Sequence, residues 1–335
     1  MKAEQILLAK RPQGVPTDDV FKYETVDLAD PSDGEIQVEA IYISVDPYMR
    51  GRMNEGKSYV QPFEVNKPLN GHIVARVIKS KAQGFSNGDI VVGRLPWQTA
   101  VNIQPDDVTK VTQTDIPLHL YLSVLGMTGQ TAYHGLLKIG QPKAGETVVV
   151  SAASGAVGSV VGQIAKLKGA RVVGIAGGKE KTDYLVTELG FDAAVDYKDS
   201  QYASLLADAV PDGVDVYFEN VGGHVADEVL KHLNQFARIP VCGAISGYND
   251  VEIDHGPRIQ PILIKSQALM QGFIVANYAD DFANASKELA QWVTEDKIKS
   301  KTSIMDGFEH LPQAFRNLFT GDNFGKQVVR VKDRE

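Results

Sequence analysis

The stretch ETVVVSAASGAVGSVVGQIAKLKG, residues 146–169, decides the fold of this chain. It opens with a β-branched run, Thr147 to Val150, which is typical of a strand buried on both faces. Ala153, Gly155 and Gly158 follow at the spacing A-x-G-x-x-G, and apolar residues at helical spacing continue from there. A strand, a tight glycine turn and a helix form the first unit of a dinucleotide-binding fold, in which the helix N-terminus holds the pyrophosphate.

Two other interpretations of this stretch compete with a nucleotide turn. Residues 147–165 carry no charge, and Gly158 and Gly162 imitate a motif by which membrane helices pair. A membrane helix is excluded because the first half is β-branched, three serines lie in the middle and glycines interrupt the run. A merely structural strand-turn-helix stays open, since the first glycine of the usual motif is Ala153 here. The strand that follows favours the nucleotide turn.

The end of that next strand, residues 171–176, is where a dinucleotide site contacts the adenosine ribose. A site selective for NAD usually has Asp or Glu there, which accepts a hydrogen bond from the 2′-hydroxyl. This chain has two glycines instead, followed by Lys179, Glu180 and Lys181. Because the two lysines lie where a 2′-phosphate would be, the sequence predicts NADP(H). The alternative is a charged helix start on the surface with no role in cofactor binding.

The composition is that of a globular protein with room for two domains. The chain has 335 residues, of which 43% are hydrophobic and 23% charged. A formal net charge of −8 argues against nucleic acid or an anionic membrane as a partner. The single cysteine, Cys242, excludes an intramolecular disulfide framework and a zinc site built from several cysteines. The N-terminus lacks a long apolar stretch and a cleavage site, so we expect a cytoplasmic protein without a signal peptide.

Short strands and turns fill the first third of the chain, and helical periodicity begins only near Leu118. The strands expected there lie at 5–8, 36–43, 72–78, 89–92 and 100–103. Strands and helices then alternate, as in a doubly wound sheet. The strands expected there lie at 147–150, 171–176, 193–195, 214–218, 237–241 and 269–275, and helices at 179–189 and 280–296. The tail ends in an apolar strand, 327–331, which cannot form its own core and is expected to rejoin the first domain.

Six motifs occur in an order that matches one protein family. They are SVDPYMR (44–50), GMTGQTAY (126–133), AASGAVGS (152–159), ENVGG (219–223), CGAISGYN (242–249) and GDNFGK (321–326). Together they resemble the zinc-independent medium-chain dehydrogenases/reductases, in the branch of NADPH-dependent 2-alkenal, prostaglandin and curcumin reductases. The resemblance covers nearly the whole chain. It implies an α/β chain with a GroES-like β-rich catalytic domain (1–126), a Rossmann NADPH-binding domain (127–298), a return to the first domain (299–335), and an active-site cleft between the domains.

The resemblance also implies a cofactor site. Lys181, aided by Lys179, would bind the 2′-phosphate, and Tyr197 would lie by the adenosine ribose. The pyrophosphate would be held by Gly155, Ala156, Val157 and Gly158. The middle and the nicotinamide end would be contacted by Asn220, Cys242, Gly243, Ala244, Ile245, Ser246, Phe273, Ile274, Val275 and Asn323. Taken singly, such residues have structural explanations too, such as a turn-forming asparagine or a buried apolar thiol.

Relatives that oxidise alcohols hold a catalytic zinc, and this sequence departs from their ligand set. The first ligand position is Ser44, and the Gly-His-Glu element has become Gly71-His72-Ile73. With no thiolate and one imidazole, these motifs do not assemble a three-ligand zinc site, so we expect no metal. His72 is interpreted as a structural histidine.

Hydride transfer to an activated alkene needs no metal if the carbonyl oxygen is stabilised as charge develops on it. Tyr48 is the first candidate for the hydrogen-bond donor and Tyr248 the second, although either could simply form the pocket wall. A ribose hydroxyl of the cofactor is a further possible donor. Lys265 stands where mammalian and plant members carry tyrosine, so either it supplies the stabilising charge or the substrate sits differently.

The sequence therefore favours an NADPH-dependent reductase of the carbon–carbon double bond of α,β-unsaturated aldehydes and ketones. A quinone reductase and a non-catalytic NADPH-binding protein on the same fold are the alternatives. The resemblance also implies a homodimer in which the strand at 269–275 pairs across a two-fold axis. An apolar strand there could equally be central in the sheet.

Overall fold

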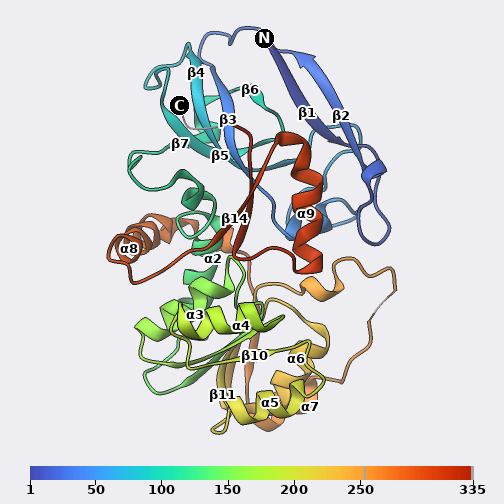
Figure 1. Cartoon of the computed structure of the whole chain (residues 1–335), viewed down its shortest axis with the longest axis vertical. Coiled ribbons are helices and arrows are strands. Elements are labelled where there is room, and N and C mark those ends of the chain that lie inside the picture. Colours follow the sequence, from blue (N-terminus) through green and yellow to red (C-terminus); the bar gives the residue numbers. More distant parts are fainter. Residues whose placement is uncertain (253, 333–335) are drawn as a thin grey trace. The chain divides into compact units, whose positions relative to one another are not determined.

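The computed structural model describes residues 1–252 and 254–332, and the chain divides into two compact units. The first unit contains residues 1–122, 302–323 and the end of the chain from 327. The second contains residues 123–301 and 324–326. The first unit is β-rich and the second is built on a parallel sheet flanked by helices (Figure 1), so the expected fold class is confirmed.

The first unit consists mainly of antiparallel strands. Its strands are β1 (Lys2–Leu8), β2 (Phe21–Asp27), β3 (Ile36–Ser44), β4 (Asn70–Ser80), β5 (Ile90–Pro96), β6 (Ala100–Ile103), β7 (Val108–Lys110), β14 (Thr302–Asp306) and β15 (Lys326–Arg330). Strands β1 and β2 form a two-stranded sheet of their own. The others form a seven-stranded sheet in the order β14-β15-β3-β4-β5-β7, with β6 pairing with β3.

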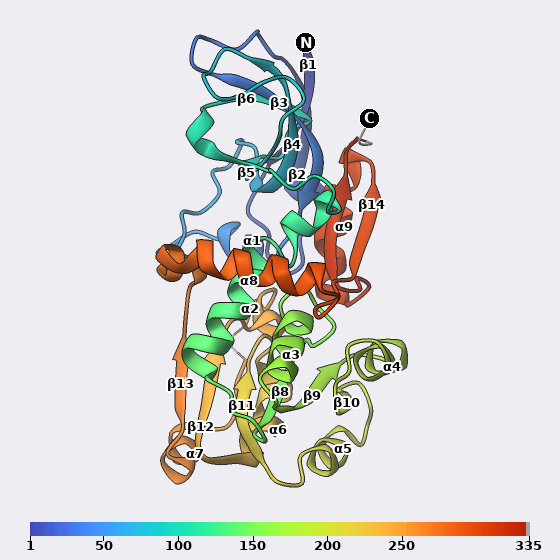
Figure 2. The same ribbon diagram turned by 90° about the vertical axis from the view of Figure 1, so that its left-hand side faces the viewer.

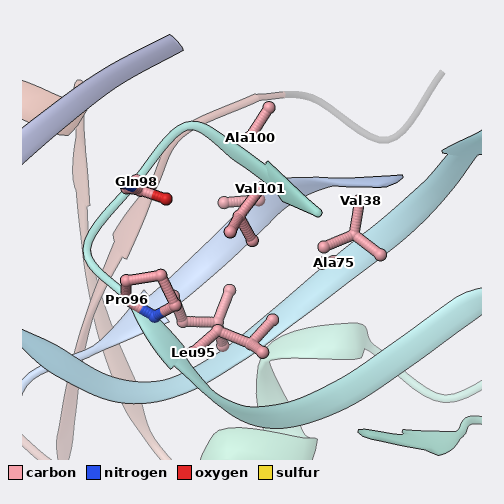
Figure 3. A pocket seen from close by; sticks show the side chains of 9 residues that line it. Val38, Ala75, Leu95, Pro96, Gln98, Ala100 and Val101 are labelled. Atoms are coloured by element: carbon pink, nitrogen blue, oxygen red, sulfur yellow. The ribbon is translucent and has the colours of Figure 1, made fainter. Parts of the chain in front are cut away.

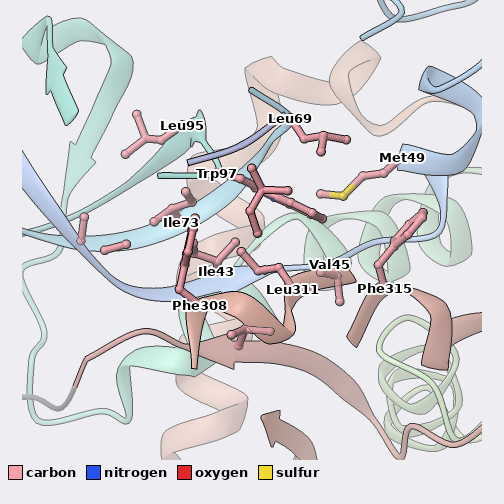
Figure 4. Packing of buried hydrophobic residues seen from close by; sticks show 14 of the residues in the cluster. Ile43, Val45, Met49, Leu69, Ile73, Leu95, Trp97, Phe308, Leu311 and Phe315 are labelled. Carbon is pink, nitrogen blue, oxygen red and sulfur yellow. The ribbon is translucent and has the colours of Figure 1, made fainter. Parts of the chain in front are cut away.

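Two helices complete the core of the first unit. Helix α1 (Tyr48–Arg52) follows β3 directly and buries Met49 completely, while α9 (Leu311–Thr320) lies far along the chain. Leu311 and Phe315 of α9 join the same apolar cluster as Met49 and Ile43, as Figure 4 shows. Strand β15 pairs with β3 in antiparallel register. The C-terminal segment is thus part of the core that supports α1.

The second unit is organised around a six-stranded sheet in which every paired strand is parallel. Its strands are β8 (Thr147–Val150), β9 (Arg171–Ala176), β10 (Ala193–Asp196), β11 (Val214–Phe218), β12 (Leu233–Val241) and β13 (Leu269–Gly272). Their spatial order is β10-β9-β8-β11-β12-β13 (Figure 2). This is the 3-2-1-4-5-6 order of a dinucleotide-binding sheet, and its direction reverses between β8 and β11.

Helices flank this sheet. The helices of the second unit are α2 (Met127–His134), α3 (Gly158–Leu167), α4 (Lys179–Thr187), α5 (Tyr202–Ala209), α6 (Gly223–Val229), α7 (Gln260–Ser266) and α8 (Phe282–Thr294), of which α8 packs on α2. Side chains of α5 and α6 share one apolar cluster with Val149 and Tyr217. Helices α2 and α3 pack together, with α3 against β8 and β9. The β8 residues are buried throughout, which matches the expectation from their β-branched run.

The strand expected at 269–275 is too long. Strand β13 ends at Gly272, and a 3-10 segment runs from Val275 to Asp281 before α8. The chain leaves the sheet at Phe273 because this ring packs edge-on against Phe218, in space left free by Gly135, which has no side chain. Several short elements were not predicted, among them β2, β7, β14, α1, α5, α6 and α7.

None of the helices in the described parts of the chain combines the length and the apolar character that spanning a bilayer requires.

Candidate functional site

The glycine turn after β8 is built by close backbone approaches. Ala152 adopts a left-handed conformation, with φ 48°, and its carbonyl accepts a hydrogen bond from the Gly155 N–H at 2.9 Å. A Cβ on Gly158 would lie 2.4 Å from the same carbonyl oxygen, so only glycine allows α3 to begin here. At the start of α3 the N–H groups of Ser159 and Val160 donate to the carbonyls of Gly155 and Val157, at 3.1 Å each, so the helix begins directly on the turn and its positive dipole end lies there. The turn therefore fits a pyrophosphate, and a side chain would fill it.

The departure from the usual motif, Ala153, has a structural explanation. Ala153 is completely buried, and its N–H donates to the Ile175 carbonyl at 2.9 Å. A Cβ on Gly174 of β9 would lie 3.0 Å from the Ala153 Cβ. The methyl group of Ala153 thus occupies the space that the missing side chain of Gly174 leaves. The alanine does not disturb the nucleotide turn.

The loops after β8 and β11 meet where the strand order reverses. Asn220 donates a side-chain hydrogen bond to the Ser151 carbonyl at 2.8 Å, and its N–H donates to Ser151 Oγ at 2.9 Å. In open parallel sheets, ligands bind at the carboxyl ends of the strands at this reversal. The structure thus brings Asn220 beside the loop that leads into the glycine turn.

The segment that follows β12 also lies at the carboxyl ends of the parallel strands. Residues 242–248 run close to the loop after β11, and the Tyr248 hydroxyl accepts a hydrogen bond from the Ala244 N–H at 3.3 Å. Burial of the sulfur, and then the charge of Glu219, raise the pKa of the Cys242 thiol to about 12. Cys242 therefore stays protonated at neutral pH and is not a nucleophile.

Residues 273–275 follow β13 at the same edge of the sheet. Lys265 lies at the other end of β13. It is exposed near the C-terminus of α7, the helix that precedes this strand. Within the second unit, Lys265 is therefore separated from the loops that follow β11 and β12.

The C-terminal segment contributes three residues, 324–326, to the second unit. Gly325 forms a β-bridge with Gly155, and its N–H donates to the Ser154 carbonyl at 3.0 Å. The Phe324 ring packs edge-on against Tyr184 of α4, with the ring centroids 4.8 Å apart. The glycine turn is thus closed by a segment that directly follows Asn323.

The ends of β9 and β10 form the ribose end of the expected site. A Cβ on Gly177 would lie 2.9 Å from both the Tyr197 ring and Lys198 Cε, so these side chains lie over the strand end. Lys179 instead pairs with Asp183, one helical turn further on, at 2.7 Å, and its side chain is 85% exposed. Lys198 was not predicted from the sequence. Its signal would have been its position beside Tyr197, just after the third strand.

Tyr48 begins α1 in the first unit. Its hydroxyl oxygen accepts a hydrogen bond from Arg94 Nη2 at 3.4 Å, and the guanidinium lies 5.9 Å from the ring centroid. Burial, and then the charge of Asp46, raise the pKa of the Tyr48 hydroxyl, while Arg94 opposes the shift. Tyr48 is therefore neutral, and its own proton can be donated. Arg94 is a second residue that the sequence did not single out.

The positions tested for zinc in the sequence contain no ligand cluster. The Ser44 hydroxyl is buried and donates to Asp46 Oδ2 at 2.5 Å. His72 lies in β4, opposite Arg94 of β5. Among residues 1–252 and 254–332, no three His, Cys, Asp or Glu side chains are gathered so that they could hold a metal ion.

A small pocket inside the first unit belongs to its core. It is lined by nine residues, among them Val38, Ala75 and Leu95, with a single polar side chain, Gln98 (Figure 3). The space among these side chains is too narrow to hold a water molecule. Several of the lining residues, including Leu95 and Ile73, also belong to the apolar cluster of this unit. It is interpreted as a packing gap.

Comparison with known proteins agrees with these features. Residues 4–111 match the model of an N-terminal domain of oxidoreductase, and residues 156–291 match the model named zinc-binding dehydrogenase. The NADPH-dependent curcumin reductase of Escherichia coli is 46% identical over 330 residues, which cover 97% of this chain and 96% of that protein. The NADP(+)-dependent 2-alkenal reductase of Nicotiana tabacum is 41% identical, with 98% of this chain and 97% of that protein covered.

A solved structure gives the same result. The crystal structure of CurA from Vibrio vulnificus in complex with NADPH superposes with a TM-score of 0.95 at 42% identity, covering 99% of this chain and all of that one. The fold and the glycine turn define a dinucleotide-binding oxidoreductase of two units. The chain belongs to the medium-chain dehydrogenase/reductase family, in the branch of NADP-dependent curcumin, prostaglandin and 2-alkenal reductases. The resemblance inferred from the six motifs is confirmed.

Proposed function

We propose that this protein is a zinc-independent, NADPH-dependent reductase of the carbon–carbon double bond of α,β-unsaturated aldehydes and ketones. The observation that carries the proposal is its 41% identity, over nearly the whole length, to a 2-alkenal reductase, a name that specifies this class of substrate. The glycine turn and the lysines beyond β9 support NADPH as the cofactor.

The chain's own residues have separate roles in this reaction. Gly155 to Gly158 and the N-terminus of α3 hold the pyrophosphate, and the loops after β11, β12 and β13 enclose the nicotinamide end. NADPH, when bound, would supply the hydride for the β-carbon of the substrate. The electron pair of the carbon–carbon double bond then forms the bond between the α-carbon and the carbonyl carbon, and the carbonyl π pair moves to the oxygen, where Tyr48 donates a hydrogen bond to the enolate. A proton taken up from water completes the saturated product at the α-carbon.

Product analysis tests the proposed reaction. With 2-nonenal and NADPH, we expect saturated nonanal, because conjugate addition spreads charge into an enolate and needs no Lewis acid, whereas direct carbonyl reduction forms a full alkoxide. Gas chromatography identifies the product. Activity should also survive treatment with a chelator. An allylic alcohol as the main product, or activity only with quinones, would contradict the proposal.

Cofactor selectivity should depend on Lys181 and Lys198 more than on Lys179. Lys181→Ala and Lys198→Ala should each make the free energy of NADPH binding less favourable by roughly 1–3 kcal/mol, which is the range of a charge-assisted hydrogen bond. The binding of NADH should change little. Lys179→Ala is the matched control, because its ammonium is already paired with Asp183. Equilibrium binding of both cofactors measures the effect. Equal losses of NADPH and NADH affinity would place the 2′-phosphate elsewhere.

A homodimer is the expected assembly. Strand β13 forms the outer edge of the sheet (Figure 2), and Leu269 on it is 50% exposed. Pairing of two such edges would cover backbone groups that otherwise invite aggregation. We expect a dimer mass at micromolar concentration by sedimentation, and dissociation by Leu269→Lys. Leu205→Lys, an exposed leucine in α5, should have no effect; a monomeric wild-type protein would contradict the assembly.

The cytoplasm is the proposed compartment. Its support is the single cysteine, since extracellular proteins more often carry disulfide frameworks.

A further inference from the structure

Glu219 is a buried carboxylate at the point where the sheet order reverses. It directly follows β11, between Phe218 and Asn220, and its exposed fraction is only 3%. A buried carboxylate is costly unless hydrogen bonds satisfy it. The position therefore needs an explanation, and none of the roles given above includes this side chain.

One oxygen of the Glu219 carboxylate joins two loops. Its Oε1 accepts hydrogen bonds from the Val221 N–H at 2.7 Å and the Gly222 N–H at 3.0 Å. The Ser151 hydroxyl donates to the same oxygen at 3.0 Å. Two of these donors belong to the turn before α6, and the third belongs to the loop that leads from β8 to the glycine turn. Bonds to a charged acceptor are stronger than neutral ones, so the carboxylate holds the two loops together.

The backbone around Glu219 also holds the segment that follows β12. The N–H groups of Cys242 and Gly243 donate to the Glu219 carbonyl, at 2.9 and 3.2 Å. Those of Ile245 and Ser246 donate to the carbonyls of Asn220 and Val221, at 3.2 and 3.0 Å. Residues 242–246, which the family resemblance places at the nicotinamide end, are thus hydrogen-bonded to residues 219–221.

We infer that Glu219 is a positioning residue for hydride transfer: through its carboxylate it sets the geometry of Asn220 and of residues 242–246 at the nicotinamide end. The inference rests on the proposed function, because these residues matter only if the cofactor binds there. Glu219 itself acts through the backbone that it fixes. A small displacement of the nicotinamide relative to the substrate slows hydride transfer more than it weakens binding.

The experiment compares three variants with the wild-type protein. Glu219→Gln removes the charge but keeps the size, and Glu219→Asp keeps the charge. Aspartate can still accept hydrogen bonds from the residues two and three positions further on. Glu146→Gln is the matched control, because Glu146 is a half-buried carboxylate that is also paired, with Arg238 at 2.5 Å, but lies at the opposite end of the same sheet.

Three quantities are measured for each variant. They are the NADPH Kd, the hydride-transfer rate constant in a single turnover with 2-nonenal, and the Tm. We expect Glu219→Gln to lower the rate constant by roughly ten- to a hundredfold and to raise Kd by a smaller factor. Glu219→Asp should recover most of the rate. Glu146→Gln should lower the Tm while leaving the rate constant and Kd at wild-type values.

The results separate this inference from the proposed function. Failure of the wild-type protein to reduce any enone overturns the proposed reaction, and the NADPH Kd of the variants then decides the role of Glu219 by itself. A Glu219→Gln protein with wild-type rate and Kd, or a Glu146→Gln protein with an equal loss of rate, overturns the inference. If Glu219→Gln does not fold, Ser151→Ala removes one of the three donors to Glu219 together with the acceptor of the Asn220 N–H, and an unchanged rate in that variant overturns the inference too.

Discussion

Replacing Tyr48 with phenylalanine should lower kcat roughly ten- to a thousandfold, the range for loss of one donor to a developing oxyanion, with a smaller change in KM. The hydroxyl oxygen already accepts from Arg94, so its proton remains available for the substrate oxygen. Because burial raises the pKa of Tyr48 above its ordinary value of about 10, the phenol stays a neutral donor throughout the physiological range. Steady-state kinetics with 2-nonenal measure the effect.

A second tyrosine in the same unit provides the control for Tyr48. The Tyr121 hydroxyl donates to the Gln113 carbonyl at 2.8 Å, so Tyr121→Phe removes a hydrogen bond without touching α1. Its kcat should equal that of the wild-type protein. In the wild-type protein, no loss of activity from ionisation of Tyr48 is expected below about pH 10, because its pKa is shifted upward. An unchanged kcat in Tyr48→Phe would leave the reaction class standing and move the donor to Tyr248 or the cofactor ribose.

Replacing Gly158 with alanine should have the largest effect on cofactor binding. The new Cβ would lie 2.4 Å from the Ala152 carbonyl oxygen and 2.9 Å from Ala153 Cα, which are backbone atoms that cannot rotate away. Overpacking of this kind costs roughly 1–3 kcal/mol and displaces α3 from the end of β8. We expect a lower Tm, and an NADPH affinity at least about tenfold weaker, because the N–H groups that face the pyrophosphate shift with the helix.

A second Gly→Ala variant, outside the turn, is the control. It separates the effect of crowding at Gly158 from any general effect of replacing glycine with alanine. Gly51 in α1 lies outside the left-handed region, and a Cβ added to it would have no atom within 4 Å. Gly51→Ala should therefore lower neither Tm nor NADPH affinity. Calorimetry and titration with NADPH measure both. Wild-type affinity in Gly158→Ala would show that the turn does not hold the pyrophosphate.

The central strands were predictable because their signals are local. The β-branched runs at 147–150, 171–176 and 214–218 coincide with β8, β9 and β11, each bounded by turn-forming residues. The last strand was predicted too long because most residues from Leu269 to Val275 are apolar. Its end at Gly272 depends on the contact of Phe273 with Phe218, which lies 55 positions earlier in the chain.

The lysines of the site likewise show which features are local in the sequence and which depend on contacts between distant residues. Two lysines beyond β9 were evident from the sequence, because the absence of Asp or Glu there is a local feature. Where the lysine side chains lie was not evident, since Lys179 pairs with Asp183 and Lys198 reaches Gly177 from the neighbouring strand. Only the pairing of β9 with β10 places Lys198 there.

The sequence by itself determined the dinucleotide turn, the alternation of strands and helices, and membership of the family, because each can be inferred from short segments with a fixed spacing. The tertiary structure decided how Ala153 is accommodated opposite Gly174, which residue contacts the Tyr48 hydroxyl, and what holds together the loops after β8, β11 and β12. Glu219 is the clearest case, since its carboxylate bonds to Ser151, 68 positions away. Contacts of this kind depend on the order in which parallel strands are laid side by side, which no short segment encodes.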